Sequence, residues 1–165
     1  MTEQEVRKGG GGKLSRSETV TVRLDPKLRY LAELAGRLHR RTLSSYIEWA
    51  IKEALDREGV RATGTPSGVE TDRTIGNEAD YLWDVDEADR FAKLALRYPH
   101  LLTHDEQVRW KFIEESFRLW GDGTPFNDPA EGKLNFGRLR RNWEFIKQCI
   151  DQGKPAGSVA MRMEE

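Results

Sequence analysis

The chain has 165 residues, of which 37% are hydrophobic and 33% are charged. Its single cysteine, Cys149, excludes an internal disulfide and a cysteine-based zinc site. No run approaches the ~20 apolar residues that a membrane span needs, and the polar, glycine-rich start has no apolar signal-peptide core. We therefore expect a cytoplasmic protein without membrane association.

The net charge of −1 conceals a strong asymmetry along the chain. Residues 1–62 carry a net charge of +4, residues 63–131 carry −8, and residues 132–165 carry +3. A basic block followed by an acidic block indicates a division of labour, in which the basic part meets a polyanion and the acidic part meets a basic protein. The alternative interpretation is that both blocks are simply solvated surfaces.

Composition also predicts the domain organisation. A run of four glycines at residues 9–12 is typical of a flexible arm, and a stretch rich in Gly, Pro, Ser and Asn is typical of a linker. The predicted segments are an arm at 1–13, a first domain at 14–57, a linker at 58–78, a helical accessory domain at 79–151 and a tail at 152–165.

Periodicity predicts one strand and two helices in the first domain. Apolar and polar residues alternate strictly over 19–24, which is typical of a half-buried strand. Asp25 and Pro26 then form a helix start, and the basic run 39–41 suits the C-terminus of that helix. Thr42 is the candidate N-cap of a second amphipathic helix that extends to about Arg57.

A lone strand leaves its backbone donors and acceptors unpaired, and about forty residues bury too little surface to fold alone. Both problems disappear if two chains pair their strands and share one core, so the sequence predicts a homodimer. The residues predicted to form this dimer core are Val20, Val22, Leu24, Leu31, Ile47, Ala50 and Ile51.

Residues 17–57 resemble a ribbon-helix-helix domain of the Arc/MetJ/CopG type. The resemblance rests on the order of a strand, an Asp-Pro helix start, a basic turn and the pattern Thr-x-Ser-x-x-Ile-x-x-Ala-Ile. It implies a mainly α fold with an intertwined dimer, whose two-stranded ribbon enters the major groove of DNA.

The resemblance also implies two sets of DNA contacts. Arginine donates two hydrogen bonds to guanine, and threonine contacts several bases; the implied base-reading residues are Thr19, Thr21 and Arg23. The start of the second helix is implied to hold a phosphate, and an arm contact precedes the strand; the implied phosphate residues are Thr42, Leu43, Ser44, Lys13 and Arg16. Leu43 departs from relatives that place a basic or polar residue there.

The second region is predicted to be a small helical bundle. Two patterns resemble capping boxes, Asp84 with Glu87 and Thr103 with Glu106. Amphipathic spacing predicts helices over 85–98, 104–120 and 136–151. The region contains four tryptophans that fill a core or anchor a protein partner: Trp83, Trp110, Trp120 and Trp143.

Several side chains in this region are candidates for catalysis or metal binding, but we expect structural roles for them. The acidic cluster suits a helix start better than a nuclease cleft, and its members are Asp80, Asp84, Asp86, Glu87 and Asp89. His100 and His104 lie in a turn without a third metal ligand. Cys149 is expected to pack in the core. A basic patch on the third helix is expected to be a solvated surface or to contact DNA beside the main site; its residues are Arg138, Arg140 and Arg141. We expect no enzyme activity, metal or cofactor.

The function predicted from these observations is that of a homodimeric, sequence-specific DNA-binding transcriptional repressor, with residues 79–151 as a candidate surface for a protein partner. One alternative is an antitoxin whose N-terminus binds DNA and whose C-terminus binds a toxin. A plasmid partition or conjugation accessory protein would use the same DNA-binding module. A nuclease that uses the acidic cluster is a more distant alternative.

Overall fold

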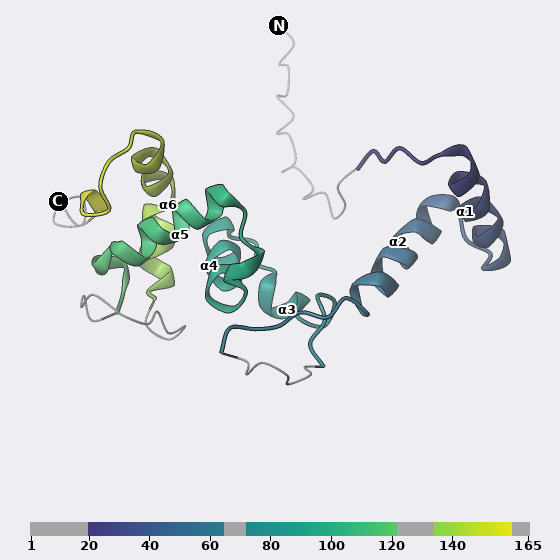
Figure 1. The fold of residues 1–165 in the computed structure, drawn as a ribbon, viewed down its shortest axis with the longest axis horizontal. Helices are drawn as coiled ribbons and strands as arrows, with labels where there is room; N and C mark the ends of the chain where they lie inside the picture. The colour runs from purple at the N-terminus through teal and green to yellow at the C-terminus, as the bar shows by residue number, and fades with distance from the viewer. Residues whose placement is uncertain (1–19, 65–71, 122–133, 160–165) are drawn as a thin grey trace, which may run out of the picture. The chain divides into compact units, whose positions relative to one another are not determined.

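The computed structural model describes residues 20–64, 72–121 and 134–159 (Figure 1). The chain divides into two compact units, with the boundary after Glu48. The described residues form six α-helices and two 3₁₀ turns. Their bounds are Pro26–Leu38 (α1), Leu43–Leu55 (α2), Ala79–Leu82 (α3), Glu87–Arg97 (α4), Pro99–Leu101 (η1), His104–Glu115 (α5), Phe117–Leu119 (η2) and Phe136–Asp151 (α6).

Helix α1 begins where the sequence predicts. The side chain of Asp25 accepts hydrogen bonds from the backbone N–H groups of Lys27 and Leu28, both at 3.0 Å, and Pro26 occupies the first helical position. The helix ends at Leu38.

The turn between α1 and α2 requires special backbone geometry. Arg40 adopts a left-handed conformation with φ of 54°, and the N–H of Arg41 donates to the carbonyl oxygen of Gly36 at 2.8 Å. A Cβ atom at Gly36 would lie only 3.1 Å from the carbonyl oxygen of Arg41. The turn therefore depends on the missing side chain of Gly36.

The predicted β-strand at 19–24 is wrong. Thr19 lies outside the described residues, and residues 20–25 precede α1 without regular secondary structure. A strand is defined by backbone hydrogen bonds to a neighbouring strand, and residues 20–24 make none within the part of the chain that the structure describes. Val20 and Val22 remain 78% and 62% exposed. Between residues 20 and 48 the regular structure is helical. Without a strand, the predicted intertwined ribbon dimer is also wrong.

The second unit begins with the last turns of α2. The N–H of Gly76 donates to the carbonyl oxygen of Leu55 at 3.0 Å, and the N–H of Ile75 donates to that of Glu58 at 2.9 Å. Gly59 and Thr74 form an isolated antiparallel bridge. The described parts of the segment that composition assigns to a linker, 58–64 and 72–78, are thus hydrogen-bonded to each other and to the end of α2.

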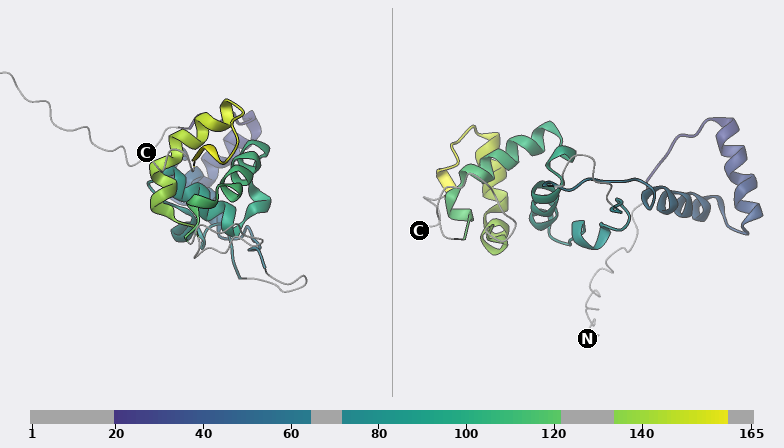
Figure 2. Two further views of the ribbon diagram at one scale, coloured as in Figure 1. Left: turned by 90° about the vertical axis from the view of Figure 1, so that its left-hand side faces the viewer. Right: turned by 60° about the horizontal axis from the view of Figure 1, so that its bottom comes forward.

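Helices α4, α5 and α6 pack around one hydrophobic core, as expected for a helical bundle (Figures 1 and 2). Phe91 of α4 and Trp143 of α6 have ring centroids 5.3 Å apart, and Trp110 of α5 meets Trp120 edge to face. Trp110, Trp120 and Trp143 are buried, whereas Trp83 is 67% exposed.

Among residues 20–64, 72–121 and 134–159, no helix combines the length and the apolar character that crossing a bilayer requires.

Candidate nucleic-acid interface

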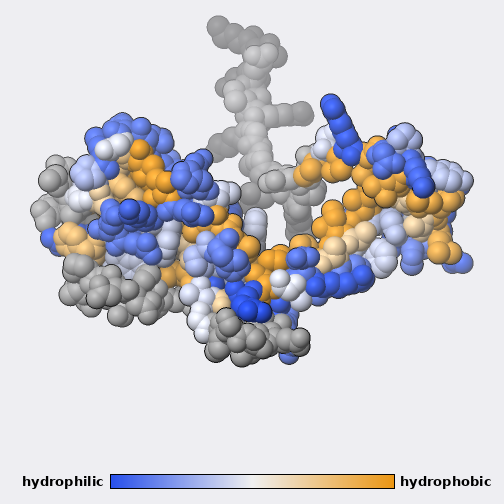
Figure 3. Space-filling view, viewed as in Figure 1, coloured by the Kyte–Doolittle hydropathy of each residue, from blue (hydrophilic) through white to orange (hydrophobic). Residues whose placement is uncertain are grey.

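The first unit exposes most of its apolar side chains. Gly36 is the buried residue of α1 and α2 has none, although both helices are described in full. Hydrophobic residues gather on the surface of these two helices (Figure 3). The exposed leucines of α1, all in the first unit, are Leu28, Leu31, Leu34 and Leu38; on the turns of α2 that belong to the second unit, Ile51 and Leu55 are exposed. Helix α1 therefore leaves an apolar surface on a unit with little core.

None of the predicted dimer-core residues is fully buried in the single chain. Four are exposed: Val20, Val22, Leu31 and Ile51. Three are half-buried: Leu24, Ile47 and Ala50. Ala50 and Ile51 lie beyond Glu48, in the second unit, and the role of all seven in a dimer stays a prediction.

The predicted base-reading residues lie on the segment that precedes α1. Thr21 and Arg23 are both exposed, whereas Thr19 lies outside the described residues, as do the predicted arm contacts Lys13 and Arg16. The extended backbone of Asp25, with φ of −65° and ψ of 155°, leads this segment directly into α1.

The predicted phosphate residues lie at the start of α2. The Thr42 hydroxyl accepts a hydrogen bond from the N–H of Ser45 at 3.2 Å, so Thr42 acts as the N-cap. Leu43 is half-buried and Ser44 is exposed. The first N–H groups of a helix have no partner within it, so those of Leu43 and Ser44 suit an anion. His39 stacks on Tyr46, with ring centroids 6.0 Å apart, and this contact holds the turn against α2.

The charge of the described first unit is positive. Residues 20–48 contain six Lys and Arg against three Asp and Glu. Asp25 is engaged as the α1 cap, and Glu33 pairs with Arg29 at 3.2 Å. Exposed Arg37 and Arg40 lie next to the start of α2 in sequence. The segment that leads into α2 is therefore rich in exposed cations.

The acidic cluster serves the fold of the second unit. Asp86 caps α4 by accepting from the N–H groups of Ala88 and Asp89. The hydrogen bond from Lys93 to Asp84, at 2.8 Å, lowers the pKa of that carboxyl, as does the backbone N–H of Asp86. Burial raises the pKa of Asp89, whose carboxylate lies 3.3 Å from the Arg140 guanidinium.

The remaining cluster members do not complete a metal site. Glu87 pairs with Lys147 at 3.4 Å, and Asp80 is exposed on α3. Within the described ranges, no three His, Cys, Asp or Glu side chains are placed to hold a metal ion.

The other candidates lie in three different elements. His100 lies in η1, where it contacts Tyr98 edge to face, and His104 is the exposed first residue of α5. Cys149 is buried in the core.

The basic patch on α6 is divided between the fold and the surface. Arg138 donates to the carbonyl oxygens of Arg118 and Trp120 at 3.0 and 3.3 Å. Arg140 pairs with Asp89, and Arg141 is exposed. Two of the three arginines thus have structural partners.

A buried ion cluster escaped the sequence analysis. Glu78 is 8% exposed, and its two carboxylate oxygens pair with Arg73 at 2.8 Å and with Arg97 at 2.9 Å. Burial alone raises the pKa of Glu78, but the neighbouring Tyr98 hydroxyl and the two guanidinium groups outweigh burial and lower it. The cluster joins Arg73 and Glu78, from the segment before α3, to α4. Its members are far apart in sequence and carry no motif.

We expect Glu78→Gln to destabilise the second unit by about 1–3 kcal/mol at pH 7, because it weakens two charge-assisted hydrogen bonds. A lowered folded-state pKa contributes stability above the ordinary glutamate pKa of about 4.3, and that contribution is lost as the pH falls through the folded-state value. Urea unfolding followed by tryptophan fluorescence should therefore show the two proteins converging below about pH 4. Parallel stability curves from pH 7 to pH 3 would contradict this assignment.

Comparison of the chain with protein-family models, with characterised proteins and with solved structures finds no match. The inferred resemblance of residues 17–57 to the ribbon-helix-helix family is therefore wrong on two grounds. No family model matches it, and the described residues contain no β-strand of the kind that such a domain needs. What the structure does show is a chain that is mainly helical in its described parts.

Proposed function

We propose that the chain is a homodimeric DNA-binding regulatory protein whose first unit contacts both a second copy and the DNA. The observation that carries this proposal is the combination, in one small unit, of exposed apolar side chains on α1 with an excess of positive charge. The proposal requires no β-ribbon.

The dimer is supported by the poor burial of the first unit. Leu28 and Leu31 are each 50% exposed and Leu34 is 38% exposed, and a unit of this size buries too little surface to be stable alone. Burying a leucine side chain contributes about 1.5–3 kcal/mol relative to full exposure. A second copy that covers the same surface gives each unit the core that it lacks.

DNA binding is supported by the turn between α1 and α2. The N–H groups at the start of α2 and the exposed Arg37 and Arg40 are suited to phosphate oxygens. Thr21 and Arg23, exposed before α1, carry the hydrogen-bonding groups that read base edges. We assign the turn to phosphate contacts and the segment before α1 to base contacts.

Salt dependence of DNA binding tests the proposal. Affinity for a 30-base-pair duplex, measured by fluorescence anisotropy, should fall steeply with salt, since each neutralised phosphate adds about 0.9 to the slope of log K against log [salt]. The Arg37→Ala/Arg40→Ala variant removes four cations from a dimer, so its slope should be less steep by about 4.

The matched control for that variant is Lys111→Ala/Lys154→Ala, which removes equal charge from exposed positions in the second unit. Its salt slope should equal that of the unchanged protein. A duplex affinity that does not respond to salt, or an equal loss of slope in the two variants, would refute DNA binding through the turn.

Arg23→Ala should cost sequence preference rather than general affinity. On a site enriched from random duplexes we expect a loss of about 1–3 kcal/mol, with little change on unselected DNA, because a bidentate contact to guanine is lost. Lys27→Ala, the matched control, removes the same charge from the first turn of α1 and should weaken both kinds of duplex equally. If Arg23→Ala behaves like Lys27→Ala, Arg23 contacts phosphate and not base.

A further inference from the structure

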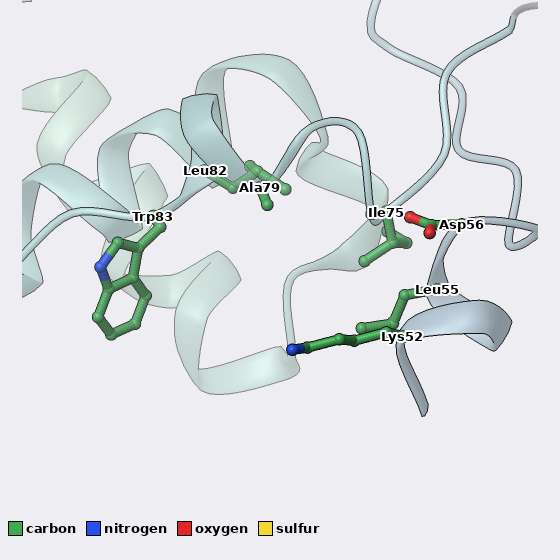
Figure 4. A pocket seen from close by; sticks show the side chains of 8 residues that line it. Lys52, Leu55, Asp56, Ile75, Ala79, Leu82 and Trp83 are labelled. Carbon is green, nitrogen blue, oxygen red and sulfur yellow. The ribbon is translucent and has the colours of Figure 1, made fainter. Parts of the chain in front are cut away.

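A pocket of about 490 Å³ opens within the second unit, between the last turn of α2, residues 75–76 and α3 (Figure 4). Most of its lining is apolar, with Leu55 from α2 and Leu82 and Trp83 at the end of α3. Sites for small molecules have volumes of about 300–1,000 Å³ and apolar walls with a few placed polar groups. The pocket has the size and the lining of such a site.

The backbone fixes the floor of the pocket. The N–H of Gly76 donates to the carbonyl oxygen of Leu55, and a Cβ at position 76 would collide with the Asp56 carboxylate and lie only 3.1 Å from backbone atoms of residues 55 and 56. Glycine therefore allows the chain to approach the end of α2 this closely. The pocket wall is set by hydrogen bonds, so it exists before any ligand arrives.

Trp83 forms an exposed aromatic wall that is nevertheless held in place. Its ring is 67% exposed, yet the Arg90 guanidinium lies 4.9 Å from the indole centroid. Arg90 is itself fixed, because it donates to the carbonyl oxygens of Asp84 at 2.6 Å and Val85 at 3.2 Å. A large apolar ring positioned by hydrogen-bonded groups rather than by burial is prepared for stacking.

The charges around the pocket favour an anion near Trp83. Lys52 lines the pocket, and in Figure 4 its side chain extends from α2 toward the side on which Trp83 stands. An ammonium group has three N–H donors, so Lys52 can donate a hydrogen bond to a ligand in addition to its contacts within the protein. Arg90 adds positive charge next to the ring, and Lys93 neutralises Asp84. The carboxylate in the lining, Asp56, stands beside Ile75 in Figure 4, on the side away from Trp83, so the positive charge lies at the Trp83 side of the pocket.

We propose that this pocket binds a small planar aromatic molecule with one anionic group, such as an aromatic carboxylate. The ring stacks on Trp83 and covers Leu55 and Leu82, and the anion receives hydrogen bonds from Lys52. The site belongs to the second unit alone, so ligand binding there does not depend on DNA binding by the first unit.

Titration of the full-length chain with 2-naphthoate tests the proposal, with the indole N–H resonance of Trp83 followed by NMR. For a ligand of this size we expect a dissociation constant of about 1 mM or tighter and a shift of the Trp83 resonance. The cation 2-naphthylmethylamine, which has the same ring, should bind at least about tenfold more weakly because Lys52 and Arg90 repel it.

Three variants locate the ligand. Calorimetry should show naphthoate affinity falling about tenfold in Lys52→Met and in Trp83→Ala, since each removes one named contact. It should be lost in Ala79→Phe, whose ring fills the pocket. Lys111→Met, on the exposed face of α5, is the matched control and should bind as the unchanged chain does. Trp83 is exposed, so its replacement should keep the helical circular dichroism.

Four results would overturn the proposal: no shift of the Trp83 resonance, equal or tighter binding of the amine, unchanged naphthoate affinity in both Lys52→Met and Trp83→Ala, or full binding by Ala79→Phe. If naphthoate fails to bind while Trp83→Ala alters the sedimentation coefficient of the chain, the pocket is instead a contact surface for a second copy.

Discussion

Replacing Leu31 with Asp is expected to abolish the homodimer and, with it, DNA binding. Leu31 lies in the middle of α1, is 50% exposed in the single chain and belongs to its apolar surface. In the proposed dimer this position is covered by the second copy. An unpaired carboxylate buried there would cost more than about 3 kcal/mol per protomer, which a two-helix unit cannot absorb.

Sedimentation velocity should show a dimer for the unchanged chain at micromolar concentration and a monomer for Leu31→Asp. The affinity of Leu31→Asp for duplex DNA should fall to the weak affinity of a monomer, which has only one first unit to contact the DNA. Gln148→Asp adds the same negative charge at an exposed position on α6 and should leave both measurements unchanged. A Leu31→Asp chain that remains dimeric would show that the exposed surface of α1 is not the dimer interface.

Local signals in the sequence predicted the helices well. Asp25 and Pro26 start α1, and Thr103 with Glu106 forms the capping box of α5, because both devices depend on residues within one helical turn. The predicted helix over 136–151 coincides with α6. The Asp84 capping box was misplaced: Asp86 caps α4, while Asp84 accepts from the N–H of Asp86 and pairs with Lys93.

Features that depend on distant residues were predicted poorly. Alternation at 19–24 describes one face of a strand, but a strand exists only with a hydrogen-bonded neighbour, which these residues lack in the described chain. The helix predicted over 104–120 ends at Glu115, where the hydroxyl of Ser116 donates to the carbonyl oxygens of Phe112 and Ala156. The second of these acceptors lies forty residues away in sequence, so no local pattern contains it.

The candidate sites divide in the same way. The sequence predicted Arg23 and the start of α2 as DNA contacts, and that role stays a prediction; the structure shows that Arg23 is exposed and that Thr42 caps α2, which are local features. The pocket beside Trp83 was not, since it forms only when residues 75–76 meet the end of α2. Trp83 carries no sequence mark that separates it from Trp110, Trp120 and Trp143; its position before α4, outside any helical stripe, leaves it exposed.

The buried and the exposed tryptophans should differ sharply in their contribution to stability. We expect the largest loss of stability in the second unit from Trp120→Ala. Trp120 is 1% exposed, and its indole N–H donates to the carbonyl oxygen of Ile113 at 3.0 Å. Its ring meets Trp110 edge to face at 6.1 Å. Removing the ring leaves a cavity and deletes one of the two hydrogen bonds that the Ile113 carbonyl oxygen accepts, since the N–H of Ser116 still donates to it. We expect a cost of about 3–5 kcal/mol, most of it from the cavity.

Such a loss should lower the melting temperature of the second unit by about 15–30 °C, as followed by circular dichroism. Trp83→Ala is the matched control, because it deletes the same side chain from a position that is 67% exposed. It gives up the cation–π contact with Arg90, worth about 0.5–1 kcal/mol at an exposed site. We expect the melting temperature of Trp83→Ala to fall by a few degrees, since most of the Trp83 surface is already exposed to solvent. Equal losses in the two variants would mean that Trp83 is packed in solution and would remove the exposed wall on which the proposed ligand site depends.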